Sequence, residues 1–405
     1  MAPAMLHPDR QRRSLERLFI GIYFWIFWMM CLNGTYLNLY LKREAGYTGT
    51  QIGLLSGILS ATSVLVTPLI GLWFDLSRKR QRFLAVLALI AGSAFCVYAA
   101  PVPWFVLAPV AVVFGCGWLP LIPLLDAMAS TAHVAGASAR GYGGYRRWGT
   151  IGFAVAGGLA GQCTGAFGLW SVFPVYAAVA LIVAVLVARI PAEAAGHGKE
   201  QAAAVASRVP RLTDVSDLLR LPNFRRFLAV VLFSSLGSAA CYSFRAIYLS
   251  SIGLSDRAIG TLWLLIIPGE VICFTLAARW RDRFGTGPLV MFGLTVSGLR
   301  WILLSFVRPP WLYAVELLHG VGFAVYHPAA VAFVQQEAPV RLRGTAQILF
   351  FSTAAGLGSA VGAALAGRIY DAFGMRPVLW WGGSLMMVGG FLQVLLVRHH
   401  GPAKR

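Results

Sequence analysis

Long apolar stretches separated by polar breaks dominate the sequence and restrict what it can fold into. Each has the roughly 17 to 25 residues that a tilted helix needs to cross a bilayer. Because 58% of the chain is hydrophobic and only 12% is charged, a soluble core cannot absorb them. The alternation typical of barrel strands is absent, so we predict transmembrane helices. Their expected ranges are 18–41, 51–74, 83–100, 104–126, 147–167, 169–189, 227–250, 258–279, 287–307, 311–335, 345–367 and 377–397.

The basic residues indicate how these helices are oriented. With the N-terminus in the cytoplasm, most of the 34 lysines and arginines fall in loops on that side. This is the positive-inside pattern, and an even number of spans then places both termini in the cytoplasm. The net charge of +19 therefore reports topology, and we expect no nucleic-acid partner, because the aromatic residues lie within apolar runs. The expected location is a bacterial-type inner membrane.

One long interruption divides the runs into two sets of six. Residues 190–224 are rich in Ala, Pro and charged residues, as is typical of a linker between a first bundle, 1–189, and a second bundle, 225–405. A short motif recurs every three helices, which indicates nested three-helix repeats. We predict an all-α membrane fold of twelve helices in two pseudo-symmetric six-helix bundles. The copies are GLWFDLSRKR (71–80), AGQCTGAFG (160–168), AARWRDRFG (277–285) and AGRIYDAFG (366–374).

The acids of this motif stand where helices end. Asp75 can be attracted to the positive N-terminal end of a neighbouring helix or to nearby bases such as Arg78. Asp282 and Asp371 occupy corresponding places in later copies. We predict that these four residues act as a conformational latch, and the alternative is a set of solvated loop charges.

The motif at 71–80 resembles the loop signature of the major facilitator superfamily. GYGGYRRWGTIGF (141–153), GTLWLLIIPGEVICF (260–274) and LLHGVGFAVYHPAAVAFV (317–334) are similar to the phenylpropionate permease branch, itself similar to the lactose permease group. This resemblance spans essentially the whole chain. It implies proton-coupled uptake by alternating access, with the proton gradient as the energy source and no cofactor.

Ionisable residues within apolar runs are costly and are therefore functional candidates. Asp126 ends the fourth run and Arg146 begins the fifth, so consecutive helices can place a carboxylate beside a guanidinium that grips a polar solute. The resemblance implies that an acid and an arginine at these places bind substrate. It also favours Arg146 over Arg147, because Arg146 keeps the matching distance to Gly149, and we expect Arg147 to be an anchoring charge.

Four charged residues in the second set of runs are candidates for proton coupling. Glu270 and Arg300 lie near the middles of their runs, and Glu316 and His319 share one helical face. A carboxylate and an imidazole can bind and release a proton as access alternates. The resemblance agrees for Glu270, Arg300 and His319, but it departs at Glu316 and at Gly322, which leaves the division of roles open. The alternative is a structural network that only keeps charges paired.

The remaining candidates are possible substrate contacts. We expect Arg245 to snorkel toward the interface, with the alternative that it meets an anionic aromatic solute. His327, before Pro328, either lines the pathway or bonds a freed carbonyl group. Trp148 and Trp263 are substrate candidates, although a tryptophan at helical spacing is more often packing.

These residues predict a proton-driven symporter that imports a small organic solute, such as an aromatic carboxylate met by Arg146 or Arg245. The alternatives are a sugar or nucleoside symporter, an efflux antiporter for a drug or metabolite, and a non-transporting receptor, against which the buried charges argue. The sequence contains no P-loop, GxSxG or HExxH motif, so we expect neither an enzyme nor a metal site. The expected partners are a small solute, protons and the lipid bilayer, and the protein is expected to be a monomer.

Overall fold

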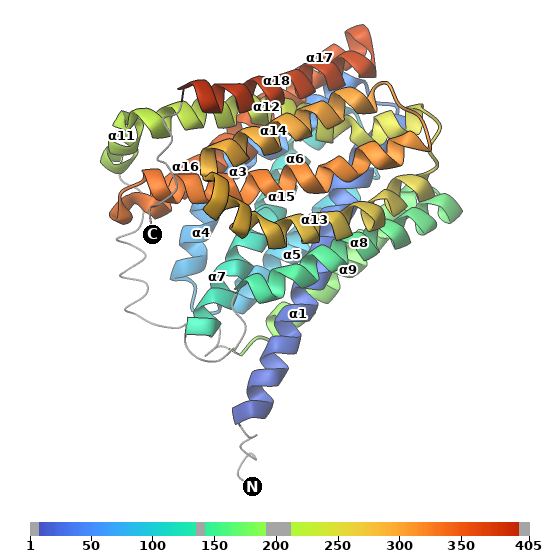
Figure 1. Ribbon diagram of the computed structural model, residues 1–405. Coiled ribbons are helices and arrows are strands. Elements are labelled where there is room, and N and C mark those ends of the chain that lie inside the picture. Colours follow the sequence, from blue (N-terminus) through green and yellow to red (C-terminus); the bar gives the residue numbers. More distant parts are fainter. Residues whose placement is uncertain (1–7, 135–141, 192–211, 397–405) are drawn as a thin grey trace. The chain divides into compact units, whose positions relative to one another are not determined.

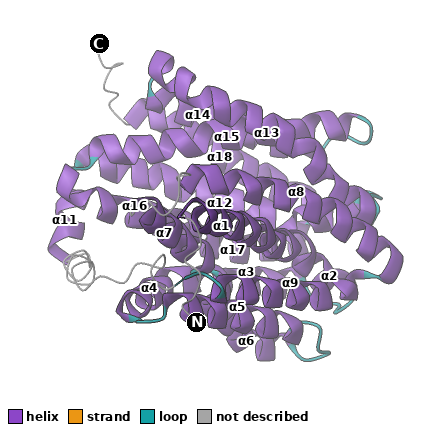
Figure 2. Ribbon diagram, turned by 90° about the horizontal axis from the view of Figure 1, so that it is seen from below, coloured by secondary structure: helices purple, strands orange, loops and turns teal. Residues whose placement is uncertain are grey.

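The computed structural model describes residues 8–134, 142–191 and 212–396, and these ranges contain helices but no strand (Figures 1 and 2). Part of the predicted linker, 192–211, lies outside the described residues. The helices are α1 (Pro8–Leu32), α2 (Asn38–Arg43), α3 (Gly49–Leu65), α4 (Thr67–Leu76), α5 (Arg80–Val97), α6 (Trp104–Trp118), α7 (Leu121–Val134), α8 (Tyr142–Phe167), α9 (Val172–Ala188), α11 (Leu212–Arg220), α12 (Pro222–Ser251), α13 (Asp256–Phe284), α14 (Thr286–Leu304), α15 (Trp311–Glu337), α16 (Arg343–Phe351), α17 (Ser359–Phe373) and α18 (Met375–Leu396).

The expected all-helical membrane architecture is confirmed in outline. The described residues form ten helices that are long and apolar enough to cross a membrane, or up to eleven if α3 and α4, bent by 43°, count as one span. Helix α8, which covers the expected range 147–167, is not among them, because its many glycines and its polar residues lower its mean hydropathy. The count of twelve spans stays a prediction.

The described helices pack into two compact units. The first comprises Met1–Tyr36 and Leu65–Ser207, and the second comprises Leu37–Val64 and Arg208–Arg405. The sequence predicts a division along the chain, whereas packing assigns α2 and α3 to the second unit. A π-helical segment, Asn33–Leu37, joins α1 to α2 at this boundary.

Small residues let α3 lie against α17 within the second unit. A Cβ atom added at Gly57 would be 2.8 Å from the carbonyl oxygen of Ala360, and one added at Gly53 would collide with the carbonyl oxygen of Ala363. Glycine is therefore required at Gly53 for the two backbones to approach this closely.

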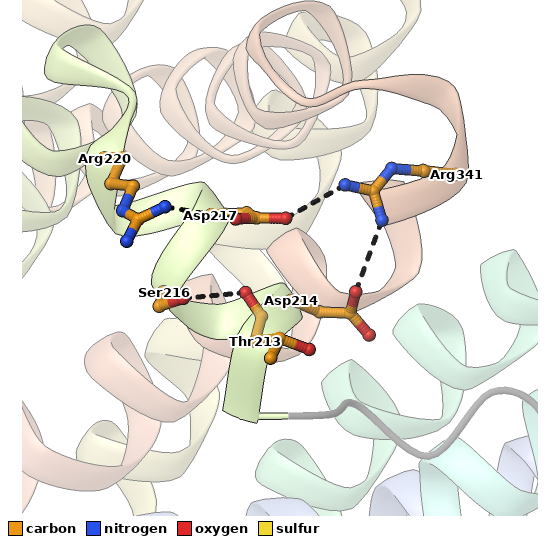
Figure 3. A network of polar contacts seen from close by, with 6 residues as sticks. All are labelled: Thr213, Asp214, Ser216, Asp217, Arg220 and Arg341. Carbon is orange, nitrogen blue, oxygen red and sulfur yellow. Dashed lines mark hydrogen bonds and ion pairs between the residues drawn. The ribbon is translucent and has the colours of Figure 1, made fainter.

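Within the second unit, Arg341 contacts the short helix α11 (Figure 3). The two terminal nitrogens of this guanidinium lie 3.4 Å from Asp214 Oδ1 and 3.0 Å from Asp217 Oδ2. Leu218 of the same helix is fully buried. These contacts fix the end of the linker that leads into α12.

Candidate functional site

Four consecutive helices of the second unit, α12 to α15 (Figure 1), carry buried charged residues of the candidate site. Glu316 on α15 is 0% exposed, Arg300 on α14 is 1% exposed and Arg245 on α12 is 3% exposed. Burial of this kind is tolerated only when charged groups are paired and hydrogen-bonded. We call these three residues the arginine cluster.

Glu316 bridges the two arginines of the cluster. Arg245 Nε donates to Glu316 Oε1 at 3.1 Å, and Arg245 Nη2 lies 3.0 Å from the same oxygen. Arg300 Nη1 donates to Glu316 Oε2 at 2.7 Å. Each carboxylate oxygen thus serves one guanidinium, and the three helices α12, α14 and α15 are held together at this point.

Aromatic rings cover the two guanidinium groups. The Arg245 guanidinium carbon lies 4.4 Å from the centre of the Trp263 ring, and that of Arg300 lies 3.8 Å from the centre of the Trp301 ring. The Tyr242 ring lies 5.7 Å from the same carbon of Arg300. The faces of these rings attract the cations, and they also exclude water from the arginines.

A second polar group lies beside the cluster. His319 Nδ1 and the Tyr242 hydroxyl are hydrogen-bonded at 2.8 Å, and His319 Nε2 lies 3.8 Å from Glu270 Oε2. The Trp263 ring meets the His319 ring edge to face at 5.7 Å. A carboxylate, an imidazole and a phenol that lie next to one another in space can hold and transfer a proton. We call Glu270, His319 and Tyr242 the proton group.

The first unit holds the other predicted ion pair. Arg146 Nη1 lies 3.2 Å from Asp126 Oδ2, and the Tyr23 hydroxyl donates to Asp126 Oδ1. Arg146 also lies over the Phe27 ring at 5.6 Å. Arg147 is exposed and bonds the carbonyl oxygen of Gly144 on its own helix, which fits the expected anchoring charge.

The residues of the predicted latch lie in different surroundings. Asp371 accepts hydrogen bonds from the amides of Gly49 and Thr50 at the start of α3, both at 2.7 Å. Asp75 lies 3.6 Å from Arg80, whereas Arg78 is exposed. Asp282 lies 3.6 Å from Arg281. Asp371 therefore has the kind of contact with a neighbouring helix N-terminus that the sequence suggests for Asp75.

The structure changes two interpretations made from the sequence. The expected snorkelling of Arg245 is wrong, because this side chain is buried and paired with Glu316. Glu316 and His319 share a helical face as predicted, yet Glu316 contacts the arginines while His319 contacts Tyr242 and Glu270.

The remaining candidates lie close to aromatic side chains or within helix α8. His327 stacks on Phe323 with ring centres 5.4 Å apart. Trp148 lies on α8, two residues after Arg146, and its indole nitrogen is buried without a hydrogen-bond partner among the described residues.

Sequence reasoning did not assign a site role to three aromatic residues that contact the predicted charges. The Tyr242 hydroxyl bonds His319, and the Tyr23 hydroxyl bonds Asp126. The Trp301 ring covers the Arg300 guanidinium. An aromatic side chain in an apolar helix gives no signal that separates such a contact from packing. Among the described residues, no group of three or more His, Cys, Asp or Glu side chains suits a metal ion.

The chain is similar to known transporters along nearly its whole length. The model of the MFS_1 like family matches residues 18–380. The Escherichia coli K12 protein named "Probable 3-phenylpropionic acid transporter" is 30% identical over 382 residues, 92% of this chain and 93% of that protein. The maltose permease of Geobacillus stearothermophilus is 24% identical over 394 residues, 97% of this chain and 96% of the permease. The solved structure of nucleoside transporter NupG shares the fold, with a TM-score of 0.75, 18% identity and coverage of 94% of this chain and 97% of that chain.

Proposed function

The chain belongs to the MFS_1 like family of membrane transporters, and we propose that it imports a small organic solute together with protons by alternating access. We further propose twelve transmembrane helices with both termini in the cytoplasm of a bacterial-type cell, and function as a monomer. One observation carries the proposal of proton coupling. In the proton group, His319 Nε2 lies 3.8 Å from Glu270 Oε2. Tyr242 and His319 lie on α12 and α15, which also carry Arg245 and Glu316 of the arginine cluster, and Glu270 lies on the intervening helix α13.

An aromatic carboxylate is the solute that these side chains suit best. Two buried guanidinium groups offer charge and paired donors to a carboxylate. Trp263 and Trp301, which cover them, are the kind of ring on which an aromatic solute stacks. The name of the Escherichia coli relative, a 3-phenylpropionic acid transporter, is consistent with this choice.

Uptake into proteoliposomes tests the proposal. Purified full-length protein is reconstituted, and uptake of labelled 3-phenylpropionate, maltose and uridine is measured with and without an imposed pH gradient. Because the undissociated acid crosses lipid unaided, uptake into protein-free liposomes is subtracted. We expect gradient-driven accumulation of 3-phenylpropionate. Accumulation of maltose or uridine instead would identify a sugar or nucleoside symporter, and proton-driven loss from preloaded vesicles would identify an efflux antiporter.

Glu270→Gln tests the role of the proton group in the same assay. An amide cannot bind and release a proton at neutral pH, so we expect this variant to lose gradient-driven accumulation while it still exchanges labelled for unlabelled solute. Thr275→Val, on an exposed part of the same helix, is the control, since Thr275 bonds only the carbonyl oxygen of Val271. Unchanged accumulation by Glu270→Gln contradicts the coupling role.

A further inference from the structure

We infer from the arginine cluster that the solute is a monovalent anion carried with one proton, in a cycle that moves no net charge. The reason is that the anion and the ionised carboxylate of Glu270 neutralise the same buried positive charge in turn. This inference rests on the proposed proton-coupled transport of a carboxylate and adds the stoichiometry and the net charge moved in each cycle.

The arginine cluster contains one more positive charge than negative charge. Arginine stays protonated in proteins, so Arg245 and Arg300 contribute two positive charges against the one carboxylate of Glu316. All three side chains are at most 4% exposed, and water therefore screens the excess charge poorly. An unbalanced buried charge is costly in a membrane, so a further negative charge is needed.

Unused donors on Arg300 show that Glu316 does not satisfy this arginine. Nη1 of Arg300 donates to Glu316, whereas Nε and Nη2 are buried without a hydrogen-bond partner among the described residues. Buried N–H groups without partners are rare and unfavourable. The guanidinium therefore retains both charge and bonding capacity for another anionic group.

Among the acids on helices α12 to α15, Glu270 is the one besides Glu316 that can balance this charge. Helices α12 and α14 contain no Asp or Glu, and the other acids of α13 and α15, Asp256, Asp282 and Glu337, lie at or near the helix ends. Asp256 is already paired with Arg43 at 2.6 Å.

Tyr242 and His319 lie between the cluster and Glu270. The Tyr242 ring centre lies 5.7 Å from the Arg300 guanidinium carbon, and the Tyr242 hydroxyl is hydrogen-bonded to His319 Nδ1 at 2.8 Å. His319 Nε2 in turn lies 3.8 Å from Glu270 Oε2. Two thiols also lie nearby, Cys241 near Arg300 and Cys273 near Glu270. Neither thiol supplies a stable charge near neutral pH, so the balance depends on Glu270 and His319.

The charge balance couples proton and solute. With Glu270 ionised and no solute bound, the negative charges of Glu316 and Glu270 cancel the positive charges of the two arginines. A proton bound by Glu270 or His319 leaves one excess positive charge, and a monovalent anion restores neutrality. Binding of the proton without the anion is disfavoured, and so is binding of the anion without the proton. Each ligand therefore increases the affinity for the other. One proton and one monovalent anion cross together, and the translocated charge is zero.

Electrical measurements on proteoliposomes of the full chain test this inference. The probes are 3-phenylpropionate and its neutral analogue 3-phenylpropanamide, with maltose and uridine as further neutral solutes. We expect carrier-dependent uptake of 3-phenylpropionate that follows an imposed pH gradient, does not respond to a potassium diffusion potential set with valinomycin, and produces no current on a solid-supported membrane. The amide is expected to be neither bound nor carried.

Three variants test whether Arg300 supplies the positive charge that binds the anion. Arg300→Gln removes the excess charge and should weaken 3-phenylpropionate binding by about tenfold or more. Arg300→Lys keeps the charge but loses the planar fork, so it should retain electroneutral uptake with lower affinity. Arg308→Gln, an exposed arginine in the loop after α14, should behave as the unmodified protein. If Arg300→Gln does not fold, the Arg300→Lys variant still tests the inference, and so does the comparison of 3-phenylpropionate with 3-phenylpropanamide in the unmodified protein.

The outcomes separate this inference from the proposed function. A current during 3-phenylpropionate uptake, equal transport of acid and amide, or gradient-driven accumulation of maltose or uridine but not of the carboxylate overturns the inference while proton coupling stands. The absence of gradient-dependent uptake for every probe overturns both.

Discussion

The Asp371 carboxylate, near the end of α17, accepts a 2.7 Å hydrogen bond from the backbone N–H of Gly49, the first residue of α3. The adjacent amide of Thr50 donates to its second oxygen, also at 2.7 Å. A carboxylate at a helix N-terminus is favoured both by the free amides and by the helix dipole. This contact joins a helix from the first half of the sequence to one near its end.

Asp371→Asn should loosen this contact. An amide accepts at one atom and carries no charge, so the two N–H groups lose the charge interaction, which is typically worth about 0.3 to 1 kcal/mol. We expect hydrogen exchange of the amides of Gly49 and Thr50, followed by mass spectrometry, to become about two- to fivefold faster. Asp282→Asn is the matched control, since Asp282 is exposed and lies beside Arg281. Equal protection in Asp371→Asn and the unmodified protein would remove Asp371 from the latch.

Gly53→Ala should separate α3 from α17. The added methyl group would collide with the carbonyl oxygen of Ala363, and a backbone atom cannot move aside as a flexible side chain can. Gly71→Ala in α4 is the control, because nothing lies within 4 Å of a Cβ atom at Gly71. We expect Gly53→Ala to lower the melting temperature and slow transport severalfold. The control should be neutral or slightly stabilising, since alanine is the better helix former by about 1 kcal/mol.

The sequence predicts the helical fold well because long apolar runs have few other ways to satisfy their backbone in lipid. It does not predict that α3 packs with the second unit, since the small residues Gly53 and Gly57 also occur in helices that make no such contact. Hydropathy shows which segments are buried in lipid, but it does not show which helix each segment meets.

The sequence also identifies most of the charged candidates but not their pairing. Arg245 and Glu316 are 71 residues apart, and no periodic pattern connects positions on different helices. When the contact with Glu316 is not known, the sequence around Arg245 looks like that of an arginine at the membrane interface. Arg146 and Asp126 are 20 residues apart on nearby helices, so adjacency along the chain was enough to predict that pair.

Tyr242→Phe tests whether orientation of His319 matters for coupling. The variant removes the hydroxyl that bonds His319 Nδ1 and retains the ring against Trp301. A lost hydrogen bond of about 0.5 to 1.5 kcal/mol should reduce gradient-driven accumulation about two- to tenfold, with a smaller change in solute exchange. Tyr248→Phe is the control, since its hydroxyl bonds the carbonyl oxygen of Leu304 outside the proton group. A similar loss of accumulation in both variants would indicate a structural role for Tyr242.

Arg146→Lys tests the ion pair of the first unit. Lysine keeps the positive charge beside Asp126 but cannot present two parallel N–H groups to a carboxylate. If the solute carboxylate uses this guanidinium, its affinity should fall by about tenfold, as measured by the concentration dependence of 3-phenylpropionate uptake. The pair with Asp126 is partly exposed, with 41% of the Arg146 side chain accessible, so the stability of the protein should change little.

Arg147→Lys is the matched control for this prediction. Arg147 is the next residue on the same helix, is exposed, and bonds only the carbonyl oxygen of Gly144 among the contacts seen for it. Its charge suffices for an anchoring role, so lysine should replace it without effect on affinity. A loss of affinity in Arg147→Lys but not in Arg146→Lys would exchange the roles of the two arginines. No change in either variant would assign carboxylate binding to the arginine cluster, because the third buried arginine in the described residues, Arg80, stands at the first residue of α5 and lies 3.6 Å from Asp75.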